Sequence, residues 1–214
     1  MNVYIQILDE KSQRLRQLTA DLVEASKISS GNVKLDMQVI DLVELVYQTS
    51  GEFNEKFEQK ELTIVTKLPK TAVLIRADGR QLYRVIENLY NNVAKYALEK
   101  TRVYVDIAYV EEKVVFSIKN VSEHSLAREN SNAGDLTERF IRGDSSRTTE
   151  GSGLGLSIAK SLTVLMGGVF DIKVDGDLFK ASITFPQYAD GNGSDAGTED
   201  PVSEDDYVIE ESET

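Results

Sequence analysis

Apolar side chains recur along this chain with two different periods, and each period predicts one type of secondary structure. Spacings of three and four residues, which place apolar groups on one face of a helix, predict helices over 3–29, 42–60, 79–98 and 153–166. Alternation or short apolar runs, bounded by turn residues, predict strands over 33–39, 62–65, 73–75, 102–110, 113–119, 169–174 and 178–185. Asp41 and Asp78 stand where a side chain can cap the start of a helix.

The order of these segments predicts the fold class. Successive strands form pairs that short turns can close, as at Glu111-Glu112 and Asp175-Gly176-Asp177, so we expect hairpins and a largely antiparallel sheet. Helices collected on one face of such a sheet give an α+β fold rather than a doubly wound one. The long first helix, with its narrow apolar face, is typical of a helix that packs in a bundle. Residues 121–150 carry few apolar side chains, and a loop of that length is more often functional, commonly a lid.

Negative charge is concentrated at the end of the chain. The formal net charge is −12, but residues 188–214 hold ten Asp and Glu and no Lys or Arg, which leaves 26 acids against 24 bases elsewhere. This nearly balanced remainder offers no general attraction for nucleic acid or a membrane surface, so a phosphate site has to be built locally. The acidic tail has the composition of a disordered segment, and both a purely solvating tail and docking to a basic partner stay open.

Other features of the composition exclude several classes of protein. The chain has no cysteine, which excludes disulfides and thiolate metal sites. No apolar run approaches the roughly 18 residues that a membrane-spanning helix needs. The first residues lack a basic segment followed by an apolar stretch, so we do not expect a signal peptide.

The first group of candidate site residues lies on the helix predicted after Asp78. Asn88, Asn92 and Lys95 are four and three residues apart, so they share one helical face, beside the apolar face that would pack on the sheet. Amide oxygens are hard ligands suited to Mg²⁺, and a lysine beside them can meet phosphate. The alternative is an ordinary polar outer face of a helix.

The second group is a glycine-rich stretch, in which Gly151, Gly153 and Gly155 stand at alternate positions just before an apolar-periodic helix. Glycines let a backbone come close to a ligand, and the free N–H groups of a helix start suit phosphate. The spacing matches neither common glycine-rich phosphate motif, so a flexible hinge is the alternative.

Three motifs in this order resemble those of the histidine-kinase branch of the superfamily that also contains gyrase, Hsp90 and the MutL repair proteins. The segment 88–96 resembles the N box, 136–144 the F box of the lid, and 151–156 the G2 box. The resemblance covers residues 3–186. It implies a two-layer α/β sandwich of the Bergerat type, with ATP between the N-box helix and the lid.

The same resemblance implies a division of the chain into three parts. Residues 1–30 resemble the second helix of a dimerisation and phosphotransfer domain, of which the rest is missing. Residues 31–187 would be the catalytic ATP-binding domain, and 188–214 the acidic tail. We therefore expect a piece of a longer kinase, which acts as a homodimer and is membrane-anchored with this part in the cytoplasm.

Roles for the N-box residues follow by resemblance. Asn92 would be the principal Mg²⁺ ligand, with Asn88 nearby. Lys95 and Tyr96 would contact the phosphates and the nucleoside. The cofactors implied are thus ATP and Mg²⁺.

Roles in the lid and the glycine-rich stretch follow in the same way. Arg142 and Arg147 are candidates for the γ-phosphate, where positive charge would stabilise the transferring group, and Phe140 would dock the lid in an apolar groove. The residues expected to surround the phosphates are Gly151, Gly153, Leu154 and Gly155.

One departure from the family pattern concerns adenine. Members of the family carry an Asp-x-Gly-x-Gly stretch after the strand that ends near Lys119, and this chain has Asn120-Val-Ser-Glu-His124 instead. An Asn oxygen can still accept a hydrogen bond from the adenine amino group, but without charge assistance, a loss of about 1 kcal/mol. Asn120 is therefore predicted to be a weaker adenine contact, and its alternative is a turn residue that ends the strand.

A second departure is the absence of a phosphoacceptor. The sole histidine, His124, lies in the predicted loop outside the family's acceptor context, which favours a solvated loop residue. The predicted function is transfer of the ATP γ-phosphoryl group to a histidine elsewhere in the kinase, and then to a response regulator. The alternatives are a hydrolysing switch, for which Asn88 stands where a glutamate base would be needed, and a degenerate module that only binds or scaffolds.

Overall fold

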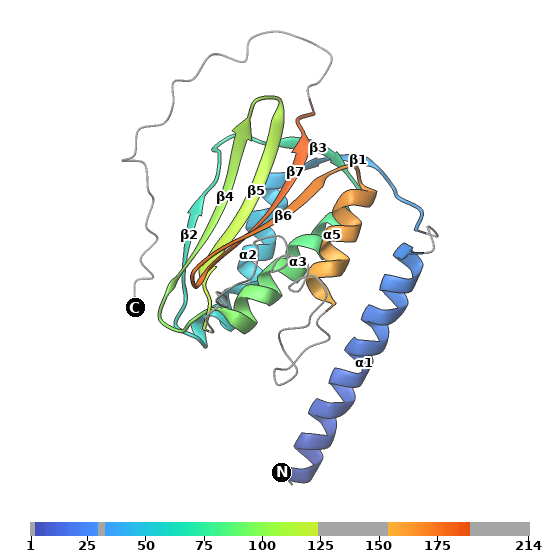
Figure 1. Ribbon diagram of the computed structural model, residues 1–214, viewed down its shortest axis with the longest axis vertical. Helices are drawn as coiled ribbons and strands as arrows, with labels where there is room; N and C mark the ends of the chain where they lie inside the picture. Colours follow the sequence, from blue (N-terminus) through green and yellow to red (C-terminus); the bar gives the residue numbers. More distant parts are fainter. Residues whose placement is uncertain (1–2, 30–32, 124–153, 189–214) are drawn as a thin grey trace.

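The structure is a computed structural model, which describes residues 3–29, 33–123 and 154–188 (Figure 1). Its elements in chain order are α1 (Val3–Ser29), β1 (Gln38–Asp41), α2 (Leu42–Glu58), β2 (Thr63–Lys67), β3 (Leu74–Ala77), α3 (Gly79–Tyr96), β4 (Arg102–Val110), β5 (Lys113–Val121), α5 (Gly155–Leu165), β6 (Val169–Asp175) and β7 (Leu178–Pro186). In these ranges, no helix combines the length and apolarity that crossing a bilayer requires.

The strands and helices form two layers, as the α+β prediction requires. Five strands pair in the order β2-β4-β5-β7-β6, and every pair is antiparallel except β2 with β4. The helices α2, α3 and α5 lie together on one face of this sheet, and α1 runs along the outer side of the helix layer (Figure 1). The predicted two-layer sandwich with a largely antiparallel sheet, preceded by one long helix, is thus confirmed.

The core lies between the two layers because alternate residues of each central strand point toward the helices. In β5, Phe116 and Ile118 are fully buried, and Ile183 of β7 is paired with Phe116. The predicted caps hold as well, since the Asp41 Oδ1 accepts from the Val43 N–H at 3.0 Å at the start of α2.

Two strand predictions are wrong. The first strand, predicted over 33–39, begins only at Gln38. Before it, the Asp36 N–H donates to the Asp78 carboxylate at 2.9 Å, so it is bonded to a side chain instead of a neighbouring strand. The strands β2 and β3 do not form a hairpin either. β2 pairs in parallel with β4, and β3 pairs with β1 in a separate two-stranded sheet, so both pairings join segments that are distant in the sequence.

Candidate functional site

The helix α3 carries the first group of predicted site residues, and its amphipathic sequence fixes which way they face. The Asp78 Oδ1 caps the helix by accepting from the Gln81 N–H at 3.0 Å. One side of α3 is fully buried and apolar, and its members are Leu82, Val85, Ile86, Leu89 and Val93. Asn88, Asn92 and Lys95 lie on another side and are all half-buried. The stripe is therefore not an ordinary solvent-exposed helix face.

Asn88 and Gly155 bring the two predicted motifs together. The Asn88 Nδ2 donates to the Arg84 carbonyl oxygen at 2.9 Å, and its Oδ1 lies 3.0 Å from the position that a Cβ on Gly155 would take. Any larger residue at Gly155 would therefore press on this amide. Gly155, the last glycine of the predicted stretch, thus begins α5 directly beside the polar stripe of α3.

Lys95 and Tyr96 lie at the end of α3. The Lys95 ammonium stands 4.7 Å from the centroid of the Tyr96 ring, within the range of a cation–π contact. Lys60 holds the same helix end, because its Nζ donates to the carbonyl oxygens of Lys95 at 2.9 Å and Ala97 at 3.3 Å. Sequence reasoning missed Lys60, since no local pattern links it to a helix that ends 36 residues later.

Asn120 lies within β5, between Val103 and Phe179 on the neighbouring strands, and not in a turn. Its side chain is 2% exposed and belongs to the helix-facing side of the strand. The Nδ2 donates to the Val121 carbonyl oxygen at 3.0 Å, whereas Oδ1 is the one buried side-chain polar atom without a hydrogen-bond partner among the described residues. An unmet buried acceptor costs about 1–3 kcal/mol, so the site suits a ligand that supplies a donor there.

Tyr90 anchors α3 to α2 and is another residue that the sequence reasoning did not single out. Its ring contacts Phe53 and Phe57, with centroids 5.3 Å and 5.9 Å away, and its hydroxyl shares a 2.7 Å hydrogen bond with the Ser50 hydroxyl. Burial raises the pKa of the Tyr90 hydroxyl to about 12, against the opposing effect of Ser50. These contacts pack α3 against α2 and thereby position the polar stripe of α3.

Arg84 links α3 to α1 one turn before Asn88. Its guanidinium lies 2.8 Å from the Glu87 carboxylate, 3.2 Å from that of Glu24 and 3.4 Å from that of Asp21. Burial opposes the charged form of Arg84, but the hydrogen bond to Glu87 and the charge of Glu24 outweigh it, and the pKa is raised. The Arg84–Glu87 spacing of three residues was visible in the sequence, but the partners on α1 were not.

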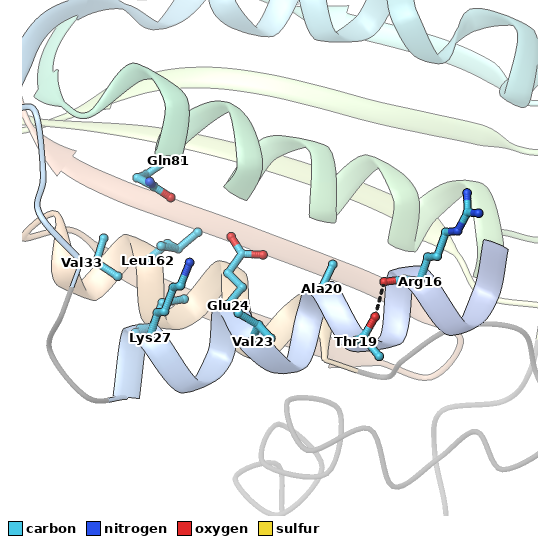
Figure 2. A pocket seen from close by; sticks show the side chains of 10 residues that line it. Arg16, Thr19, Ala20, Val23, Glu24, Lys27, Val33, Gln81 and Leu162 are labelled. Atoms are coloured by element: carbon cyan, nitrogen blue, oxygen red, sulfur yellow. Dashed lines mark hydrogen bonds between the residues drawn. The ribbon is translucent and has the colours of Figure 1, made fainter. Parts of the chain in front are cut away.

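A groove runs between α1 and the helix layer, next to this ion cluster. Its lining includes Arg16, Glu24 and Lys27 from α1, Gln81 from α3 and Leu162 from α5 (Figure 2). Charges of both signs line it, so the groove has no strong preference for an anion or a cation.

Five residues with predicted roles in the site fall outside the described residues: Arg142, Arg147, Gly151, Gly153 and Phe140. His124, predicted to be a solvated loop residue, lies outside them as well. Leu154 and Gly155 are described and begin α5. Within the described ranges, no group of three His, Cys, Asp or Glu side chains could hold a metal ion. The polar stripe of α3 carries two side-chain amides, those of Asn88 and Asn92.

Comparison with known proteins places this arrangement in a class. Residues 77–198 match the family model described as "Histidine kinase-, DNA gyrase B-, and HSP90-like ATPase". The chain is 29% identical over 164 residues to the alginate biosynthesis sensor protein KinB of Pseudomonas aeruginosa, covering 77% of this chain and 27% of KinB. It is 28% identical over 193 residues to the sensor protein VanSC of Enterococcus gallinarum, covering 88% of this chain and 51% of VanSC.

The fold has close counterparts among solved structures. The histidine kinase AdeS of Acinetobacter baumannii superposes with a TM-score of 0.71 at 17% identity, covering 88% of this chain and 86% of that one. The chain thus shares its fold with this histidine kinase.

Because the family model matches more than half of the sequence, the chain belongs to the histidine kinase-, DNA gyrase B- and HSP90-like ATPase family. Its relatives include proteins named sensor histidine kinases, such as WalK of Bacillus subtilis, and the chain is the ATP-binding catalytic domain of that class. It spans about a quarter to a half of the length of the curated relatives it matches. The resemblance drawn from the three sequence motifs is confirmed.

Proposed function

We propose that the chain binds ATP with Mg²⁺ between α3 and the glycine-rich start of α5. The observation that carries this proposal is the position of the Asn88 amide oxygen, 3.0 Å from where a Cβ on Gly155 would lie. Phosphates bound over Gly155 would then meet the amides of Asn88 and Asn92, with the Lys95 ammonium at the end of the same stripe. The buried, unmet oxygen of Asn120 supports an adenine amino group as its donor.

The donor set fits Mg²⁺, which binds one or two protein oxygens together with phosphate oxygens and retained waters. Asn92 would be the principal ligand and Asn88 the second. When bound, the ion would neutralise charge on the phosphates. Gly151, Gly153 and Leu154 would surround the phosphates with backbone N–H groups, and Tyr96 would contact the nucleoside.

The proposed reaction is transfer of the γ-phosphoryl group to a histidine of the same kinase that lies outside this chain. The bond from the γ-phosphorus to the bridging oxygen breaks, a bond to an imidazole nitrogen forms, and ADP leaves. Arg142 and Arg147 would stabilise the charge on the transferring group. The phosphoryl group would then pass to an aspartate of a response regulator.

The parts of the chain would serve this reaction separately. Residues 1–30 would belong to the dimerisation and phosphotransfer domain, 31–187 would form the catalytic domain, and 188–214 the acidic tail. We further propose that the full-length protein is a homodimer with this domain on the cytoplasmic side of a membrane. The partners are the remaining kinase domains and the response regulator.

Binding is tested by titrating the chain with ATP in Mg²⁺ and measuring the dissociation constant by calorimetry. Asn92→Ala is expected to raise this constant at least about tenfold, the equivalent of about 1.4 kcal/mol. Asn54→Ala is the matched control, because Asn54 is exposed on α2. Equal affinities for the two variants would remove Asn92 from the site.

Chemistry is tested with γ-labelled ATP, Mg²⁺ and a bundle fragment that carries the acceptor histidine. Label on that fragment that is labile to acid and stable to base supports the kinase. Release of free phosphate without label on the fragment would replace the kinase by a hydrolysing switch. Failure to bind nucleotide would replace it by a degenerate module.

A further inference from the structure

The five-stranded sheet has a second face, which the helices of Figure 1 leave uncovered, and a row of lysines crosses it. In the strand registers, Lys119 of β5 is paired with Lys180 of β7, and Lys180 with Lys173 of β6. Tyr104 of β4 continues the row, with the Lys119 ammonium 5.4 Å from its ring centroid. We call Lys119, Lys180 and Lys173 the lysine row.

This arrangement is unfavourable unless something neutralises it. Side chains directly opposite on neighbouring strands have Cβ atoms about 5 Å apart, and like charges at such positions destabilise a sheet. None of the three ammonium groups forms an ion pair with a described carboxylate. Asp106 and Asp171 stand in the row on one side, opposite Ser117 and Ser182, and Asp175 stands in the row on the other side, opposite Leu178; none of these carboxylates lies in the lysine row itself.

The chain itself contains a segment of complementary charge. The described residues end at Tyr188, and residues 189–214 hold ten carboxylates and no Lys or Arg. We propose that this acidic segment docks on the lysine row of the same chain.

The segment is long enough to reach the row. Tyr188 follows β7, and its N–H donates to the Leu74 carbonyl oxygen at 2.9 Å, so the segment starts from a fixed point. Lys180 lies eight residues before that point along the chain, at most about 27 Å away at the rise of a strand. A random coil of 26 residues has a typical end-to-end distance of about 28 Å, which matches that span.

The groove between α1 and the helix layer fits the segment less well. The groove of Figure 2 mixes Arg16 and Lys27 with Glu24 and therefore does not select an anion. Tethering raises the effective concentration to the millimolar range, so weak surface ion pairs suffice for docking within one chain.

The test uses a spin label, which the absence of cysteine makes simple. Ser203→Cys gives the full chain a single thiol in the middle of the acidic segment, and a nitroxide is attached there. In the ¹⁵N-labelled chain at low salt, we expect the amide signals of Lys119, Lys173 and Lys180 to lose intensity selectively. The signals should recover near 1 M salt, where the screening length falls to about 3 Å.

Two triple variants of equal charge complete the test. Replacing the lysine row by Gln should abolish the selective loss of signal. Replacing Lys11, Lys34 and Lys70 by Gln, all exposed residues on other segments, should leave it unchanged.

Three results would overturn the proposal. The first is no selective loss at low salt, and the second is loss centred on α3 and α5, which would place the segment at the nucleotide site. The third is the same loss when a spin-labelled ¹⁴N chain is mixed with an unlabelled ¹⁵N chain, because the segment would then dock on a second copy.

Discussion

The two faces of the five-stranded sheet differ in composition, although the same strands build both: one is almost wholly apolar, and the other mixes charged, polar and apolar residues. The helix-covered face of β5 carries Val114, Phe116 and Ile118, all buried, and departs from this pattern only at Asn120. The opposite, open face of the same strand carries Lys113 and Lys119 together with Val115, Val121 and the buried Ser117. The covered face provides most of the stability, and its polar exception is the residue that we propose contacts adenine. The open face contributes less stability and carries charge.

The largest expected effect is a loss of stability when a core residue of the covered face is removed. Phe116→Ala removes a fully buried ring from the centre of the core and should lower the free energy of unfolding by about 3–5 kcal/mol. Ser182→Ala, a half-buried position on the open face, should change it by less than about 1 kcal/mol. Urea denaturation measures both, and similar losses would show that the two faces do not differ in this way.

The helix α3 shows the same difference between two sides, because one side is buried and apolar and the other is charged. Arg84→Met leaves the buried Asp21 without this donor and should cost about 1–3 kcal/mol of stability. Hydrogen exchange of α1 amides should also become faster. Arg80→Met is the control on the same helix, since Arg80 is exposed. Unchanged exchange in Arg84→Met would mean that the ion cluster does not hold α1.

Neighbouring residues of β5 give the sharpest version of the comparison. Asn120→Ala removes the unmet acceptor and should raise the dissociation constant for ATP about fivefold, the equivalent of about 1 kcal/mol, without unfolding the domain. Lys119→Gln changes the adjacent residue on the open face and should leave ATP affinity as it is. Calorimetry measures the dissociation constant for ATP in both variants. An unchanged constant for Asn120→Ala would exclude Asn120 from the site.

The smallest expected effect is on ATP affinity when a methyl group is added at Gly155. The same change at Gly51 serves as its control. Gly155→Ala presses on the Asn88 amide and should weaken ATP binding a few-fold, because that neighbour must move by only a few tenths of an ångström. A Cβ on Gly51 would meet nothing within 4 Å, so Gly51→Ala should keep the affinity and gain about 0.5–1 kcal/mol of stability. If both variants bind ATP alike, the contact between Asn88 and Gly155 does not shape the site.

What the sequence could predict depended on how local each interaction is. The caps by Asp41 and Asp78 and the polar stripe of α3 arise from residues a few positions apart, and they were predicted correctly. The parallel pairing of β2 with β4, and the hold of Lys60 on the end of α3, join distant segments and left no local pattern. The proximity of the stripe to the glycine-rich stretch was expected from the order of the family motifs, not from spacing.

The central claim is that ATP lies against α3, α5 and the helix-facing end of β5. The most direct measurement is a titration of the ¹⁵N-labelled chain with ATP and Mg²⁺, followed by amide chemical shifts. The account predicts the largest changes at Asn88, Asn92, Asn120 and Gly155, and little change at Lys173 and Lys180 on the open face. Changes centred on the open face, with α3 unaffected, would contradict it.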